Sequence, residues 1–170
     1  MKRIFQRRID PGNGDCMQCA IASIFDLDYE KTPDFINAGQ GWFKMLYEFL
    51  QSKGYDYQGM IHNKRYQYLI TPKDYCFRQV KFHRPSQITK KALYNEAGVN
   101  GLFFASVLSP KYFTWENGAH HTTHAVVIDK DYNILHDPNP EYSNLIQYPL
   151  ADIIGFNGII DIYLINPSNA

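Results

Sequence analysis

The segment that most constrains the fold is a short apolar run that follows a turn-forming stretch near the N-terminus. Residues 16–25 read Cys-Met-Gln-Cys-Ala-Ile-Ala-Ser-Ile-Phe. A helix of this composition is apolar on nearly all sides, which is typical of a buried central helix. The preceding residues, 10–15, read Asp-Pro-Gly-Asn-Gly-Asp and favour a tight loop, with Asp15 placed to cap the helix. We therefore predict a buried helix that begins at Cys16.

The later part of the chain carries the apolar runs and turn signals of β-strands. Helices early and antiparallel strands late indicate an α+β fold, in which the N-terminal helix packs on an antiparallel sheet. A length of 170 residues fits one domain over residues 1–170. The sequence predicts helices at 42–53 and 87–97, strands at 55–62, 65–70, 76–82, 102–108 and 158–165, and a hairpin of 124–129 with 132–137.

Charge and apolar content argue against several classes of partner. Seventeen basic residues balance seventeen acidic ones, so no global field draws the chain to nucleic acid or to a membrane surface. No apolar run approaches the roughly 18 residues that span a bilayer, and residues 1–10 lack the apolar core of a signal peptide. Three cysteines do not make a secreted disulfide scaffold. We expect a cytoplasmic protein, without a membrane or nucleic-acid partner.

Cys16 is the candidate nucleophile. The N-terminus of a helix offers unpaired N–H groups and a positive dipole end, and both stabilise a thiolate. A nucleophilic cysteine also needs a base and a group that orients the base. Cys19, one turn deeper among Ala and Ile, and Cys76, between Tyr75 and Phe77, fit buried core positions instead.

His124 and Asp137 are the candidate base and orienting residue. If a hairpin turn is centred on residues 130–131, His124 faces Asp137 and Ile128 faces Asn133. Facing side chains lie on one side of a sheet with Cβ atoms about 4.5–5.5 Å apart. A carboxylate at that distance can bond one imidazole nitrogen and leave the other for the thiol. A register slip of one residue would remove this geometry.

Together these motifs resemble the papain-like cysteine peptidases in their short bacterial forms. The run Gly14-Asp15-Cys16, followed by small and apolar residues, resembles the nucleophile helix of bacteriocin leader peptidases. The run 124–128, His-Ala-Val-Val-Ile, and then 136–138, His-Asp-Pro, resembles the His and Asp motifs of that group, in the same chain order. The chain is also similar to a set of uncharacterised bacterial and phage proteins, through these motifs and through Thr32-Pro33-Asp34-Phe35.

The resemblance implies a papain-like fold and a thiol hydrolase of peptidase or amidase type. Cys16 would be the nucleophile, His124 the general base and then acid, and Asp137 the orienting residue. Enzymes of this kind usually place a Gln six residues before the nucleophile as an oxyanion donor, and here that position holds Asp10. Gln6 and Asn13 are the nearby candidate donors. This departure leaves open a catalytically weak or inactive fold that acts as a binding protein.

Three further residues are candidates for the walls of a substrate cleft. Trp115 and His121 lie in the loop before His124, and Trp42 begins a predicted helix. The implied substrate is a peptide or a small amide. Neither the motifs nor the resemblance predict a cofactor or a bound metal.

Two other chemistries remain open for the same cysteines. Cys16-Met17-Gln18-Cys19 is a Cys-x-x-Cys motif at a helix start, as in thiol-disulfide oxidoreductases, although that reading leaves His124 and Asp137 unused. The two cysteines with two of His120, His121 and His124 could hold zinc, although the His spacing is short.

The basic and aromatic stretch 62–84 could bind nucleic acid, but overall neutrality argues against it.

Overall fold

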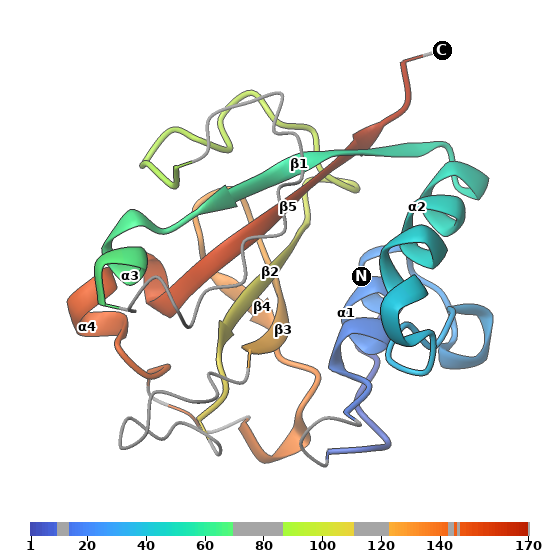
Figure 1. The fold of residues 1–170 in the computed structure, drawn as a ribbon, viewed down its shortest axis with the longest axis horizontal. Helices are drawn as coiled ribbons and strands as arrows, with labels where there is room; N and C mark the ends of the chain where they lie inside the picture. The colour runs from blue at the N-terminus through green and yellow to red at the C-terminus, as the bar shows by residue number, and fades with distance from the viewer. Residues whose placement is uncertain (10–13, 70–86, 111–122, 143–144, 146, 170) are drawn as a thin grey trace.

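A five-stranded antiparallel sheet lies at the centre of the protein (Figure 1). The computed structural model describes residues 1–9, 14–69, 87–110, 123–142, 145 and 147–169. The strand order is β1-β5-β2-β3-β4, so the short β4 lies at one edge. The strands are β1 (Tyr55–His62), β2 (Phe103–Leu108), β3 (Thr123–Ile128), β4 (Ile134–His136) and β5 (Ile159–Pro167). The fold is therefore mixed α+β, as the sequence predicts.

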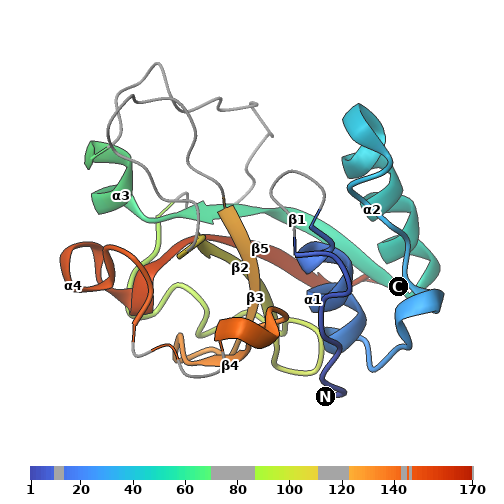
Figure 2. The same ribbon diagram turned by 90° about the horizontal axis from the view of Figure 1, so that it is seen from below.

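Helices lie at two places around the sheet. The helices are α1 (Cys16–Ile24), α2 (Trp42–Ser52), α3 (Lys64–Leu69) and α4 (Ala151–Ile154). Figures 1 and 2 show α1 and α2 together on one side of the molecule, and α3 and α4 together on the opposite side, where β1 ends and β5 begins. Among the described helices, none is long and apolar enough to cross a membrane.

The alternation of β2 divides the core into two layers. Phe103, Ala105 and Val107 belong to one buried cluster, and Phe104 belongs to the other. This follows from the two-residue period of a strand, because every residue of β2 is buried on one face or the other. The second cluster contains α1, whose Ile21 packs in it with residues of β3 and α2. The helix that begins at Cys16 is therefore held against the sheet, as its apolar composition predicts.

Residues 64–69 form a helix where the sequence analysis predicts a strand at 65–70. The side-chain oxygen of Asn63 accepts the backbone N–H groups of Arg65 (3.1 Å) and Tyr66 (3.4 Å). These bonds satisfy donors that the first turn of a helix leaves unpaired, so Asn63 is the N-cap of α3. This local cap decides the outcome in favour of a helix. The predicted strand at 76–82, with Cys76, lies outside the described residues.

An α-helix is predicted at residues 87–97, but the structure has only successive turns there, at residues 90–95. Backbone N–H groups bond three residues back, from Ala92 to Thr89 and from Glu96 to Leu93. The Tyr132 hydroxyl donates to the Thr89 carbonyl, which an α-helix would use for its own ladder. Gly98 then reverses the chain with φ +58°, and its N–H donates to the Asn166 side chain at 2.8 Å. Tertiary contacts thus override the helical pattern here.

The hairpin of β3 and β4 forms, but the predicted register is wrong. Ile128 pairs with Ile134 and Val127 with His136, with an irregularity between the two pairs. The loop is longer than predicted because the Asp129 carboxylate accepts the N–H groups of Asp131 and Asn133, each at 2.9 Å. Those bonds hold Asn133 in the loop and shift the start of β4 to Ile134.

Candidate active site

Cys16 is the first residue of α1 and is partly exposed, whereas Asp15 before it is fully buried. The Asp15 side chain does not cap the helix, contrary to the prediction. Its carboxylate instead accepts the backbone N–H groups of Arg7 and Arg8, both at 3.2 Å, and the hydroxyl of Tyr29 at 2.7 Å. The first N–H groups of α1 therefore receive no bond from Asp15, and this helix terminus lies beside the Cys16 thiol.

The N-terminal segment is tied to both sides of the site through Gln6. The backbone N–H of Gln6 donates to the Pro138 carbonyl at 2.8 Å. Its side-chain amide donates to the Arg8 carbonyl at 3.0 Å, and the same carbonyl accepts the Asp15 N–H at 3.2 Å. Gln6, one of the two candidate oxyanion donors, is thus bonded directly to Pro138, which follows Asp137, and through the Arg8 carbonyl to Asp15, which precedes Cys16. The other candidate donor, Asn13, lies outside the described residues, as does Asp10, which stands where enzymes of this kind usually have Gln.

The His124 ring and the Asp137 carboxylate form a direct pair. Nε2 of His124 lies 2.6 Å from Oδ1 of Asp137. The two side chains are only 6% and 9% exposed, so water does not separate them. Asp137 lies one residue beyond the end of β4, and His124 is the second residue of β3. The structure therefore brings these two predicted residues together, although through a different register from the predicted one.

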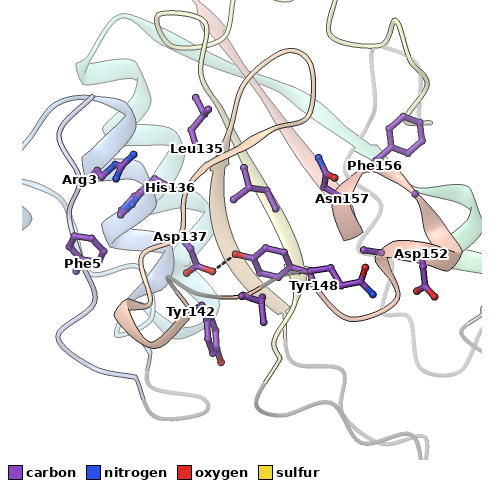
Figure 3. Close-up of a pocket in the computed structure, with 15 residues that line it drawn as sticks. Arg3, Phe5, Leu135, His136, Asp137, Tyr142, Tyr148, Asp152, Phe156 and Asn157 are labelled. Carbon is purple, nitrogen blue, oxygen red and sulfur yellow. Dashed lines mark hydrogen bonds between the residues drawn. The ribbon is translucent and has the colours of Figure 1, made fainter.

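Two further donors hold the Asp137 carboxylate. The backbone N–H of Asn139 donates to Oδ1 at 2.7 Å. The Tyr148 hydroxyl donates to Oδ2, and Figure 3 shows its ring reaching across to the carboxylate. Burial, followed by the charge and hydrogen bond of Asp137, raises the pKa of Tyr148, so this hydroxyl keeps its proton. Both carboxylate oxygens are thereby fixed, with one directed to His124.

Burial and neighbouring groups shift the pKa of His124 in opposite directions, and the neighbouring groups together have the larger effect. Burial lowers the pKa of the ring, but hydrogen bonds with Asp137 and Cys16, and the charges of both, raise it to about 9. Because Asp137 occupies Nε2, the ring nitrogen left for the Cys16 thiol is Nδ1. At neutral pH the ring is thus protonated between a carboxylate and a thiol, an environment that stabilises a thiolate.

Two tyrosines that the sequence does not single out also belong to this site. The Tyr142 ring meets the His124 ring edge to face, with centroids 5.4 Å apart and planes at 87°. The Tyr142 hydroxyl lies 3.4 Å from that of Ser109. Tyr142 therefore packs on the imidazole, while Tyr148 holds the carboxylate. No sequence spacing singles them out, because Tyr142 ends a single 3-10 turn after β4, Tyr148 follows in an irregular segment, and the chain holds 13 tyrosines.

Cavities open on both sides of the site. A pocket of about 230 Å³ is lined by Cys16 itself and by Trp42, which places this predicted cleft residue beside the thiol. The other two predicted cleft residues, Trp115 and His121, lie outside the described residues. A groove of about 680 Å³ lies on the other side, lined by Asp137, Tyr148, Arg3, Phe5, Phe156 and Asn157 (Figure 3).

The second cysteine of the Cys-x-x-Cys motif is in a different environment. Cys19 is fully buried, and burial raises the pKa of its thiol. Both Cys16 and Cys19 are free thiols. Within the described part of the chain, no group of three or more His, Cys, Asp or Glu side chains is placed to hold a metal ion. His120 and His121 of the zinc alternative lie outside that part.

The chain was compared with protein-family models, with curated proteins and with solved structures, and none of the three comparisons finds a match.

Proposed function

We propose that the chain is a cysteine hydrolase of papain-like fold that cleaves an amide or thioester through Cys16, His124 and Asp137. The observation that carries the proposal is the arrangement around His124. Asp137 bonds Nε2 at 2.6 Å, and the Cys16 thiol interacts with the same ring from the start of a helix. Nucleophile, base and orienting carboxylate are the three parts that thiol catalysis needs.

The first half of the reaction forms an acyl-enzyme. The Cys16 thiolate attacks the substrate carbonyl carbon, and the π electrons of the carbonyl move to its oxygen. When the tetrahedral intermediate collapses, the bond from carbon to the leaving nitrogen breaks, and the protonated His124 gives its Nδ1 proton to that nitrogen. The products are a thioester on Cys16 and a free amine. Asp137 stays ionised and keeps the ring in place.

The second half returns the enzyme to its starting state. The neutral His124 takes a proton from water as the water oxygen attacks the thioester carbon. Collapse of the second intermediate expels the Cys16 thiolate, which is again paired with a protonated ring. The net reaction consumes one water and yields a carboxylic acid and an amine. The oxyanion of each intermediate needs donors, and we assign this role to the backbone N–H of Cys16 together with a side-chain amide, that of Gln6 or Asn13.

The direct test is hydrolysis of a diverse peptide and amide mixture, read as new amines and as an acyl adduct on the intact protein. The proposal predicts cleavage by the wild type and by Cys19→Ser, and none by Cys16→Ala or His124→Gln. Cys19→Ser is the matched control, because Cys19 lies one turn from Cys16 but is fully buried. Cleavage that survives Cys16→Ala contradicts the proposal. A partner that binds wild type and Cys16→Ala equally, without turnover, supports the binding-protein alternative.

A further inference from the structure

The pocket beside the thiol, which we call the Cys16 pocket, has a composition that bears on the substrate. Its side walls and floor come from Met17 of α1, from Phe35 and Trp42, and from Phe104, Ala125 and Tyr163 of the sheet. Phe35, Phe104 and Ala125 are at most 4% exposed, whereas Thr123 and Ile36 at the rim are exposed. The pocket thus has a closed apolar floor and an open mouth, with the nucleophile in its wall.

From this pocket we infer the substrate class: an amide or thioester whose acyl part carries one bulky, uncharged apolar group close to the reacting carbonyl. The inference rests on the proposed function, because it takes Cys16 as the nucleophile. A carbonyl held at the Cys16 sulfur lies at the pocket mouth. A group that enters the pocket must therefore be attached only a few bonds from that carbonyl.

The size of the pocket fits one side chain. Its volume is about 230 Å³, while a dry apolar cavity of about 150 Å³ is enough to hold benzene. Sites for whole drug-sized ligands are larger, from about 300 Å³ upward. An aromatic ring or a branched aliphatic chain would fill the space, whereas a substrate with only hydrogen at this position would leave it to water.

The chemistry of the walls selects against charge. None of the described residues that line the pocket is Lys, Arg, His, Asp or Glu. A charged group would lose its water without finding an opposite charge, which is costly in an apolar setting. The polar side-chain groups of the wall, apart from the Cys16 thiol, are uncharged: they are the hydroxyls of Ser106, Thr123 and Tyr163 and the indole N–H of Trp42.

The aromatic side chains of the pocket wall pack against other aromatic rings of the protein. Phe104 packs against Tyr163 with ring centroids 4.6 Å apart, and Phe35 packs against Phe49 at 6.3 Å. Trp42 is similarly packed against Phe43 at 5.6 Å. Edge-on pairs of this kind hold rings in place, so little ordering has to accompany binding.

The test compares covalent probes on Cys16. Iodoacetamide, N-benzyl-iodoacetamide and N-(4-carboxybenzyl)-iodoacetamide share one reactive group and differ in what they place beside the sulfur. Each rate, normalised to the rate with glutathione, gives the benefit of the added group. Burial of one ring predicts that the benzyl probe labels Cys16 about 10- to 100-fold faster than iodoacetamide. The carboxybenzyl probe should show no such gain.

Pocket variants locate the effect. Trp42→Ala removes one wall, and Thr123→Trp fills the mouth from the exposed rim; each should remove most of the benzyl advantage. Tyr47→Ala is the matched control, since it deletes an exposed aromatic ring of α2 that does not line the pocket. Equal normalised rates for benzyl and plain probes would overturn the inference, as would an advantage that persists in both pocket variants.

This experiment distinguishes a wrong proposed function from a wrong inference about the pocket. The benzyl advantage is a ratio of rates at one thiol, so it does not depend on whether His124 activates Cys16. If the proposed function is wrong, each probe labels Cys16 slowly and at the same rate in wild type and in His124→Gln, whatever the ratio between the probes. If only the pocket inference is wrong, iodoacetamide labelling depends on His124 but the benzyl ratio is one.

Discussion

The Asp137 carboxylate lies 2.6 Å from Nε2 of His124, and this one bond determines which ring nitrogen can serve Cys16. The Tyr148 hydroxyl and the Asn139 N–H hold the same carboxylate from other directions. Because the side chains of His124 and Asp137 are nearly buried, the ion pair is little screened by water. The protonation of His124 is therefore the quantity on which most predictions depend.

Replacing Asp137 by Asn should lower the pKa of His124 from about 9 toward its ordinary value of 6.5. The amide keeps the shape of the side chain but removes the charge that favours the protonated ring. At pH 8 the protonated fraction would fall about 30-fold. The imidazole resonance of His124, assigned by its loss in His124→Gln, measures this by NMR titration. An unchanged titration midpoint in Asp137→Asn would be incompatible with the account.

Tyr148→Phe should weaken the site without removing it. The variant keeps the ring but loses the bond to Oδ2 of Asp137, at a cost of about 1 kcal/mol in the free energy of unfolding. Without this bond the Asp137 carboxylate is held less firmly beside Nε2, so we expect the pKa of His124 to fall below about 9 in an NMR titration of its ring, a change that a purely structural role would not produce. Tyr142→Phe is the control, because the Tyr142 hydroxyl faces Ser109 and not Asp137. Identical titration midpoints in the two variants would refute a positioning role for Tyr148.

Stability should fall as the pH rises through the pKa of His124. The folded-state pKa of about 9 lies above the ordinary 6.5, so protonation stabilises the folded state. The contribution is complete below pH 6.5 and is lost as the pH passes 9, up to roughly 3 kcal/mol. Urea unfolding of wild type and His124→Gln at pH 6 and pH 9.5 measures it. The difference between the two proteins should shrink at the higher pH, and a constant difference would contradict the assignment.

Asp15→Ala should destabilise the fold strongly. Two backbone N–H groups and the Tyr29 hydroxyl would lose their common acceptor inside the protein, which costs about 2–4 kcal/mol. Urea unfolding gives the free energy directly. Asp152→Ala removes an exposed carboxylate and should change it by less than about 0.5 kcal/mol. If both variants are equally stable, Asp15 does not anchor the N-terminal segment.

Sequence patterns correctly predict helices and strands that are determined by interactions between residues close in the chain. The apolar segment after the loop gives a helix that starts at Cys16, and strand β1 has its predicted bounds, Tyr55–His62. The strand predicted at 65–70 is wrong although its correction is also local, because Asn63 is a helix cap. The helix predicted at 87–97 is wrong for a tertiary reason, since Tyr132, far along the chain, takes a carbonyl that the helix would need.

The candidate site was predictable where one residue type has a specific chemistry. Cys16, His124 and Asp137 stand out by type and setting, and the structure brings them together. The register of the hairpin was not predictable from the turn composition, since the Asp129 side chain lengthens the loop. Tyr142 and Tyr148 could not be found, because tyrosine is common here and only the folded chain shows which hydroxyls and rings meet His124 and Asp137.

The most direct measurement is the rate of iodoacetamide alkylation of each cysteine from pH 4 to pH 9, read by mass spectrometry. The account predicts that Cys16 in the wild type reacts much faster than Cys19 and that its rate stays high at neutral and mildly acidic pH. In His124→Ala the fast reaction at low pH should disappear, while Cys19 is unchanged. If Cys16 and Cys19 react alike and slowly, with the same pH profile in both proteins, Cys16 and His124 are not a catalytic pair.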